Sequence, residues 1–120
     1  VGGDAEAWKQ IMARMLADAA DSLTQVETVI RREGIECHWR MNGRFSGAYT
    51  PRHYREQEAK VGTYNEKAAL GTYMVPRDRQ REEIASDYYH GGMVVERAGQ
   101  LHPALYYGGL LKAAHRADAK

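Results

Sequence analysis

Cysteine is almost absent from this sequence, because Cys37 is the only one in 120 residues. One thiol can form neither a disulfide within the chain nor a cluster of thiolate metal ligands, and it suits a reducing cytoplasm. Charge of one sign is also missing, since 17 basic and 16 acidic residues leave a net charge of +1. That charge creates no strong field for nucleic acid or an anionic membrane. No apolar run approaches the roughly 20 residues that a membrane span needs. We therefore expect a cytoplasmic protein without nucleic-acid or membrane partners.

Motifs that carry chemistry by themselves are missing as well. The five histidines are scattered, with no pair at the i, i+4 spacing of a helical metal site and no HExxH or CxxC motif. The glycine pairs form neither GxGxxG nor GxxxxGK[ST], so the chain alone offers no dinucleotide-binding loop. No serine stands in a GxSxG context. We expect no metal site, and no complete catalytic site, on this chain.

The clearest element that is present is a long amphipathic helix from Asp4 to Glu33, with Asp4 as its N-cap and Gly34 as the left-handed residue after its end. At 1.5 Å per residue it spans roughly 45 Å, so it needs a large partner surface. Its apolar stripe consists of Trp8, Ile11, Met12, Met15, Leu16, Ala19, Leu23, Val26, Val29 and Ile30.

The next segment has the pattern of a β-hairpin. Residues 35–41 alternate, with Cys37 as a small buried hydrophobe on the apolar face, and Asn42-Gly43 predicts a type I′ turn into residues 44–49. Thr50-Pro51 then predicts an N-cap and the first residue of a second helix, which extends to about Leu70. Gly62 interrupts that helix and allows a break there. Its weaker stripe is Tyr54, Glu58 (or Gln57), Val61, Tyr64 and Ala68.

The C-terminal third combines a charged turn, a strand and a last helix. Val75-Pro76 opens a short, highly charged helical turn on the surface, and 87–96 reads as a strand with a bulge or close backbone approach at Gly91-Gly92. Ala98-Gly99 predicts a turn. Pro103 opens the last helix, with His102 capping or packing at its start and Gly108-Gly109 packing closely against a sheet. The whole pattern, 1–120, predicts a single α+β unit with two long helices, a β-hairpin, a short antiparallel sheet and a C-terminal helix.

One stretch resembles a known family. Tyr89-His90-Gly91-Gly92, then Gly99-Gln100-Leu101-His102-Pro103, Tyr107 and Gly109-Leu110 form a pattern similar to the D-amino-acid-oxidase-like superfamily of FAD-dependent oxidoreductases. Within it, the chain looks most like the branch of the gamma-glutamylputrescine oxidases. The order of Gly34 to Cys37, Asn42-Gly43 and Thr50-Pro51 fits the same family.

The resemblance implies that this chain is an internal, substrate-side section of a larger two-domain α/β enzyme. In that parent, FAD accepts a hydride equivalent from an amine or amino acid, and the rest of the parent is the partner of this chain. The GxGxxG loop and the C-terminal glycine-rich segment of the family are absent, so we expect no FAD on the isolated chain and no activity. The candidates for substrate contact are Tyr89, His90, Tyr88 and Tyr49, although packing in a core or interface is the competing interpretation for each.

A second hypothesis belongs to a different class. The chain would be a non-enzymatic interaction module that forms a homodimer through the stripe containing Trp8, Met12, Met15 and Leu23. A reading frame that extends into a GxGxxG segment favours the oxidoreductase, whereas a gene limited to these residues favours the module.

Overall fold

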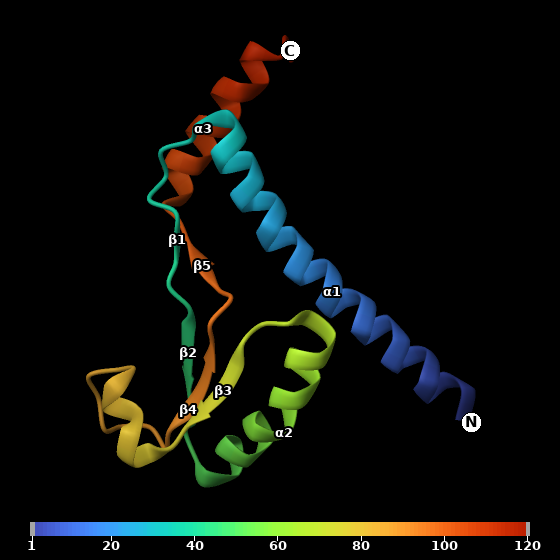
Figure 1. The fold of residues 1–120 in the computed structure, drawn as a ribbon, viewed down its shortest axis with the longest axis vertical. Helices are drawn as coiled ribbons and strands as arrows, with labels where there is room; N and C mark the ends of the chain where they lie inside the picture. Colours follow the sequence, from blue (N-terminus) through green and yellow to red (C-terminus); the bar gives the residue numbers. More distant parts are fainter. Residues whose placement is uncertain (1, 120) are drawn as a thin grey trace.

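The computed structural model describes residues 2–119, which form an α+β fold, flat and elongated at 53 × 46 × 19 Å. The class expected from the sequence is therefore confirmed. Figure 1 shows the elements in their chain order. They are α1 (Gly2–Glu33), β1 (Arg40–Met41), β2 (Arg44–Gly47), α2 (Pro51–Ala68), β3 (Thr72–Val75), the 3-10 helix η1 (Arg77–Glu82), β4 (Gly92–Val95), β5 (Gly99–Gln100) and α3 (Pro103–Arg116).

Helix α1 is as long as its apolar stripe predicts, but it begins earlier than expected. Gly2 already lies in the helix, so the assignment of Asp4 as N-cap is wrong. Asp4 lies in the first turn instead, where a carboxylate faces the positive end of the helix dipole. At the other end Gly34 has a φ of 63°, as predicted for the residue after the helix, and the N–H of Ile35 donates to the carbonyl of Ile30 at 2.9 Å.

Helix α2 begins as the sequence predicts. The Thr50 hydroxyl accepts a hydrogen bond from the N–H of His53 at 3.1 Å, and Pro51 is the first helical residue. The helix continues through Gly62, so the break that this residue allowed does not occur. Of the two alternatives for the buried stripe, Gln57 is buried and Glu58 is exposed.

The predicted hairpin at Asn42-Gly43 is wrong. Within residues 2–119, β1 pairs with β5 and β2 pairs with β4, both antiparallel, and β1 does not pair with β2. Gly43 does have a positive φ of 72°, but its N–H donates to the carbonyl of Ala98 at 2.9 Å, so the chain continues past it. Strand β2 pairs with the distant strand β4 because all four residues of β4 are buried, as in a central strand.

Further predictions about the strands and their connections need correction. His38 has a φ of 56°, which interrupts the extended backbone, so the predicted strand over 35–41 is reduced to β1. The strand expected over 87–96 is limited to β4, and Ala98-Gly99 forms no turn, because Gly99 enters β5. Strand β3 was not predicted at all; it completes the sheet in the order β2-β4-β3. The charged turn is present as η1.

The main apolar cluster lies where the end of α1 meets α3. Ile30, Ile35 and Cys37 are buried there, and Cys37 is only 1% exposed, which confirms its interpretation as a small core residue. Gly109 of α3 packs directly against the Ile35 side chain and not against a sheet, which corrects the expectation for Gly108-Gly109. The partly buried residues around this cluster are Val26, Val29, Trp39, Leu101, Tyr106 and Leu110.

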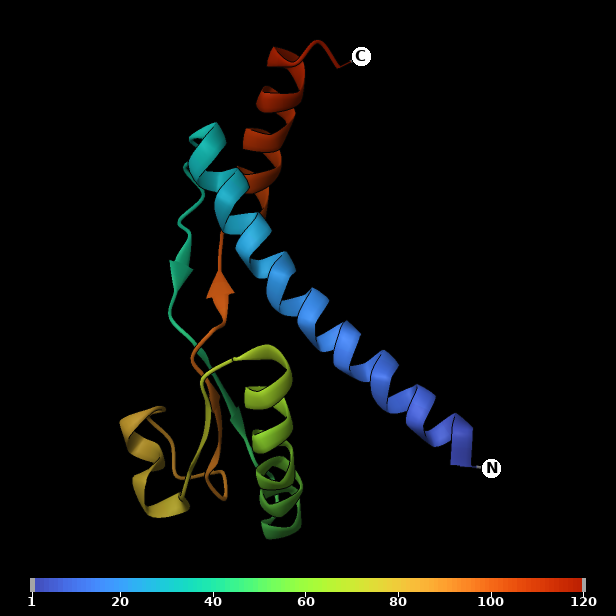
Figure 2. The ribbon, with the colours of Figure 1, turned by 45° about the vertical axis from the view of Figure 1, so that its right-hand side comes forward.

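The N-terminal half of α1 lacks such cover within the described chain. Figures 1 and 2 both show this end of the helix extending away from the sheets. Trp8 is 65% exposed and Met15 is 60% exposed, although both belong to the apolar stripe. Residues 2–119 therefore bury only part of the apolar stripe of α1.

Candidate functional site

The four predicted contact residues lie together at one end of the β2-β4-β3 sheet. Gly47 of β2 stands opposite Gly92 of β4, so the residues that follow β2 meet those that precede β4. Two hydrogen bonds extend this ladder: the N–H of Ala48 donates to the carbonyl of Gly91, and the N–H of His90 donates to the carbonyl of Ala48, both at 2.8 Å. Tyr49 is thereby placed beside the segment 88–90, which follows it in the sequence by about 40 residues.

Tyr89 is the centre of the resulting aromatic cluster, which we define as Phe45, Tyr49, His53, Tyr88 and Tyr89. The Tyr89 ring makes edge contacts with Tyr88 at 5.3 Å, Tyr49 at 5.7 Å and Phe45 at 6.2 Å between ring centroids. His53 stacks on Tyr49 at 6.0 Å, and its Nδ1 accepts a hydrogen bond from the Tyr49 N–H at 3.3 Å. Tyr88 is 73% exposed and Tyr49 is 63% exposed. The cluster therefore has a packed centre and an open outer face.

Three glycines make this packing possible. A Cβ on Gly47 would stand 2.5 Å from Cγ of Tyr89, so the Tyr89 ring lies where a side chain would otherwise be. Gly91 has a φ of 79°, and its missing Cβ leaves room for the backbone after β3 and for the ring of Tyr54. A Cβ on Gly92 would stand 2.5 Å from the carbonyl oxygen of Ser46. The predicted close approach at Gly91-Gly92 is confirmed.

Two buried glutamines bind the backbone where Ser46 and Gly91 lie close together, which we name the Gly91 crossing. The side chain of Gln80 is 1% exposed, and its Oε1 accepts a hydrogen bond from the Gly91 N–H at 3.1 Å. Gln57 donates through Nε2 to the carbonyl of Ser46 at 3.1 Å. Within residues 2–119, Nε2 of Gln80 and Oε1 of Gln57 have no hydrogen-bond partner. The sequence does not predict this role of Gln80; the one signal it offers is an uncharged residue in the middle of a charged run.

The charges beside the cluster come from η1 and the loop after it. Nη1 of Arg77 lies 3.4 Å from Nδ1 of His90. Arg81 binds the carboxylate of Asp87 with its Nε at 2.7 Å from Oδ1. This hydrogen bond, with a smaller contribution from the charge of Arg77, lowers the pKa of Asp87. The aromatic faces can attract a cation, and Arg77 can pair with a carboxylate.

The other predicted motif residues lie elsewhere. Gly99 packs against the ring of Trp39, and His102 caps α3, because its Nδ1 accepts a hydrogen bond from the Leu105 N–H at 3.3 Å. Pro103 is the first residue of α3. Strand β4 lies in the sequence between the aromatic cluster and Gly99, which begins β5. The structure thus divides the motif into two groups, one at each end of the segment 89–103.

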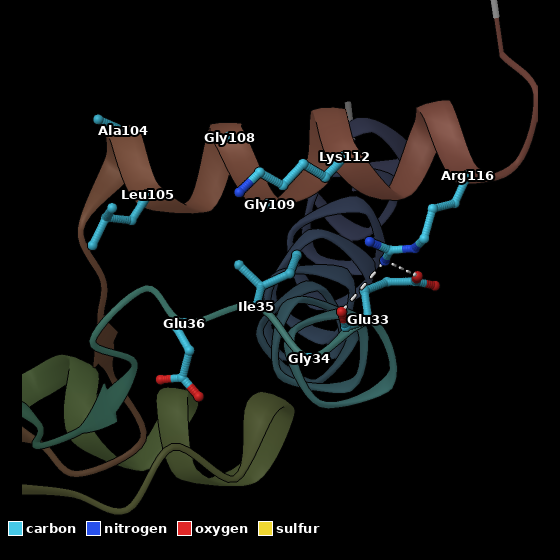
Figure 3. Close-up of a pocket in the computed structure, with 10 residues that line it drawn as sticks. All are labelled: Glu33, Gly34, Ile35, Glu36, Ala104, Leu105, Gly108, Gly109, Lys112 and Arg116. Atoms are coloured by element: carbon cyan, nitrogen blue, oxygen red, sulfur yellow. Dashed lines mark hydrogen bonds and ion pairs between the residues drawn. The ribbon is translucent and has the colours of Figure 1, made fainter.

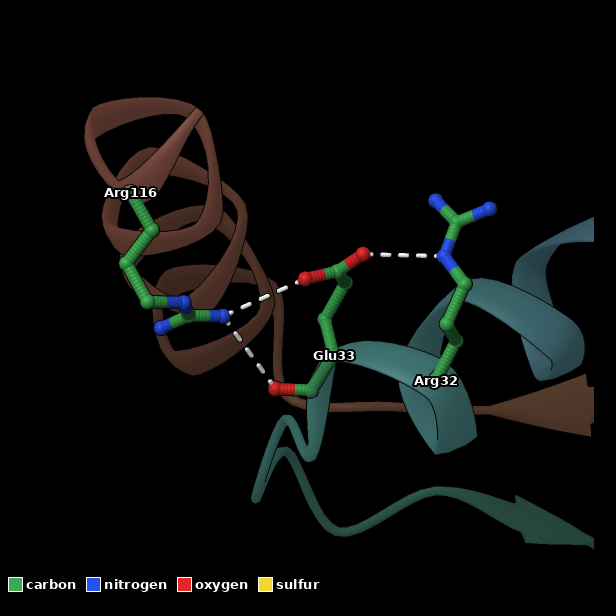
Figure 4. Close-up of polar contacts among 3 residues, drawn as sticks. All are labelled: Arg32, Glu33 and Arg116. Carbon is green, nitrogen blue, oxygen red and sulfur yellow. Dashed lines mark hydrogen bonds and ion pairs between the residues drawn. The ribbon is translucent and has the colours of Figure 1, made fainter. Parts of the chain in front are cut away.

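A groove of about 330 Å³ lies between the end of α1 and α3 (Figure 3). Two of its charged lining residues, Glu33 and Arg116, bind each other. Arg116 donates through Nη2 to Oε2 of Glu33 at 3.2 Å, and Arg32 donates through Nε to Oε1 at 2.9 Å (Figure 4). These bonds lower the pKa of Glu33, with Arg32 contributing most. Because Glu33 and Arg116 are already paired and none of the four predicted contact residues lines this groove, it is a weaker candidate than the aromatic cluster.

At Gly91 and at the starts of α2 and α3, backbone N–H groups are already engaged, so these three places do not fit the pyrophosphate of a dinucleotide cofactor. A pyrophosphate needs free backbone N–H groups at a glycine-rich turn or a helix start. The Gly91 N–H is bonded to Gln80, and Thr50 and His102 occupy N–H groups at the starts of α2 and α3. Residues 2–119 also contain no group of three or more potential metal ligands, and none of their helices is long and apolar enough for a membrane span.

Comparison with known proteins gave two findings. The sequence pattern of the DAO family, described as FAD dependent oxidoreductase, matches residues 2–120. The fold is similar to that of glycine oxidase from Geobacillus kaustophilus, with a TM-score of 0.65 and 18% identity. This similarity covers 83% of the present chain and 28% of the glycine oxidase chain, so the chain corresponds to less than a third of that structure. A comparison with curated protein sequences gave no significant match.

Proposed function

The chain belongs to the DAO family of FAD-dependent oxidoreductases, and we propose that it is the substrate-side section of a longer enzyme that oxidises an amine or an amino acid. The match over residues 2–120 is the observation that carries this proposal. The fold supports it, because a flat structure with an exposed apolar helix face resembles part of a domain more than a complete one. On this proposal, residues 1–120 form one unit whose partner is the remainder of the enzyme.

The aromatic cluster is the proposed place of substrate contact, with Tyr89 and His90 first and Tyr88 and Tyr49 next. Ring faces of tyrosine attract an ammonium group, and the exposed rings of Tyr49 and Tyr88 are accessible from solvent. Arg77, beside His90, can bind the carboxylate of an amino acid. The chemistry of the cluster therefore supports recognition of a charged amine or a zwitterion.

The flavin is held outside this chain on this proposal, because the sequence has no GxGxxG loop to bind its pyrophosphate. We expect the isolated chain to be colourless and inactive. The sequence motif further favours the gamma-glutamylputrescine oxidase branch, and the single cysteine favours a cytoplasmic location.

Steady-state kinetics of variants of the natural gene product test the contact site. We expect Tyr49→Ala and Tyr89→Ala to raise KM for the amine about three- to tenfold, the range expected for a lost cation–π contact. Tyr107→Ala is the matched control, because Tyr107 is an exposed tyrosine on α3, outside the cluster. Since Tyr89 is the packed centre of the cluster, the melting temperature of each variant must be measured in parallel. A KM that stays unchanged in folded Tyr49→Ala and Tyr89→Ala enzymes refutes the site.

The alternative is an interaction module that self-associates through α1. The exposure of Trp8 and Met15 on its apolar stripe favours this second function. Light scattering after size-exclusion chromatography tests it, and a monomer at high concentration contradicts it.

A further inference from the structure

A second and larger groove lies between the N-terminal half of α1 and the C-terminal half of α2. Its volume is about 780 Å³, and its lining includes Trp8, Met12, Leu16, Lys60, Tyr64 and Lys67. The apolar side chains come mainly from α1, and the lysines of α2 lie along the opposite side. The groove does not adjoin the aromatic cluster, which lies at the start of α2 and the end of β2.

The apolar face of α1 continues out of this groove. Trp8 and Met12 are four residues apart, as are Ile11 and Met15, so the two pairs share one face of the helix, and each residue is at least 45% exposed. Large apolar side chains exposed side by side are typical of a surface that another segment covers. The groove and this face together form one surface, which we name the α1–α2 surface.

The rim of the α1–α2 surface is cationic. Lys9, Lys60 and Lys67 line the groove, and Glu6 is its one acidic lining residue, 3.7 Å from Lys9. Lys67 pairs with its neighbour Glu66 at 2.8 Å. Lys60 forms no ion pair within residues 2–119. A segment with acidic side chains beside apolar ones would complement this rim.

We infer that the α1–α2 surface binds a segment of the same enzyme outside residues 1–120, in which apolar side chains are flanked by Asp or Glu. This inference rests on the proposed function. The family match includes all of α1, and the similar glycine oxidase has most of its chain outside the shared part, so the family fold contains further chain to supply the cover. A second copy fits less well, because a symmetric dimer through this groove presents the same lining on both copies, and its one acidic residue, Glu6, already lies 3.7 Å from Lys9.

Methionine oxidation by dilute peroxide, read by mass spectrometry, tests the inference. We compare the 120-residue chain with the product of the natural gene. Met12 and Met15 are expected to oxidise about tenfold more slowly in the gene product, because oxidation requires access to the thioether. Met93, buried in β4, is the internal control and is expected to react slowly in both. Equal rates at Met12 and Met15 in both polypeptides overturn the inference. Protection that appears in the 120-residue chain as its concentration rises also overturns it, because the cover is then a second copy.

Charge variants of the gene product test the acidic character of the covering segment. Lys60→Glu is expected to increase the oxidation rate of Met12 several-fold, and Lys60→Gln is expected to have a smaller effect. Equal effects of the two variants, or none, overturn the acidic assignment. Flavin content and amine oxidation are measured on the same samples. An active flavoenzyme with rapidly oxidised Met12 refutes this inference and leaves the proposed function intact, whereas a flavin-free product with protected Met12 refutes the proposed function alone.

Discussion

At each end of this molecule, a single side chain joins two segments that are distant in the sequence through a polar contact. Gln80 fixes the N–H of Gly91 at one end, and Arg116 reaches from α3 to Glu33 at the end of α1 (Figure 4). The first contact is buried, so its loss leaves an unsatisfied donor in the interior. The second is on the surface, where an ion pair contributes little to stability but changes the titration of its carboxylate.

The titration of Glu33 gives a prediction at this scale. Arg32 and Arg116 lower its pKa in the folded protein. The stabilising contribution is therefore present above the ordinary glutamate pKa of about 4.3 and is lost as the pH falls through the folded pKa. We expect Arg116→Gln to raise the pKa of Glu33 and leave it below the ordinary value, because Arg32 remains. NMR titration of the Glu33 carboxyl carbon measures this.

Arg31→Gln is the matched control for that titration. The Arg31 guanidinium donates to Glu27 at 2.7 Å, so removing its charge should leave the titration of Glu33 nearly unchanged. An unchanged pKa in Arg116→Gln, or an equal change in Arg31→Gln, would contradict the assigned contacts.

Residue roles could be predicted from the sequence where they depend on local backbone. Gly34 after a helix and Thr50-Pro51 at a helix start are set by groups within a few residues, and both predictions are confirmed. The same holds for His102, whose side chain caps α3. The role of Gln80 could not be predicted, because its partner Gly91 is 11 residues away and lies in a different element.

At the scale of elements, helices were easier to predict than strand pairing. The apolar period of α1 and the capping residue of α2 identify both helices. The Asn42-Gly43 pattern predicts a local hairpin. In the structure the apolar strand β4 lies between β2 and β3, and β2 pairs with β4 instead. Pairing depends on which strand is buried most completely, and a local turn motif does not contain that information.

The close backbone approach at the Gly91 crossing predicts that a side chain at this position destabilises the protein. We expect Gly91→Ala to lower the free energy of unfolding by about 2–4 kcal/mol, because a positive φ and a crowded Cβ both oppose the side chain. Urea denaturation measures it. Gly62→Ala is the control: no described atom lies within 4 Å of its Cβ position. We expect that variant to gain about 0.5–1 kcal/mol through helix propensity. A Gly91→Ala protein as stable as the unsubstituted chain would contradict the close crossing.

At the scale of the whole molecule, residues 2–119 form a flat structure that leaves apolar surface open. The α1 stripe predicted the need for a large partner surface, and the exposure of Trp8 and Met15 agrees with that need. The family resemblance is the main basis for the four contact candidates, and the structure brings them together at one end of a sheet. Substrate contact by these residues stays a prediction, because it depends on atoms that this chain does not contain.

The visible absorption spectrum of two purified polypeptides tests the central claim most directly. After incubation with FAD and gel filtration, the 120-residue chain should retain no flavin, because its sequence has no GxGxxG loop and N–H groups at Gly91 and at the starts of α2 and α3 are already bonded. The product of the natural gene should carry about one FAD per polypeptide, as a member of this family would. A natural gene product without flavin, or stoichiometric flavin retained by the 120-residue chain, would contradict the account.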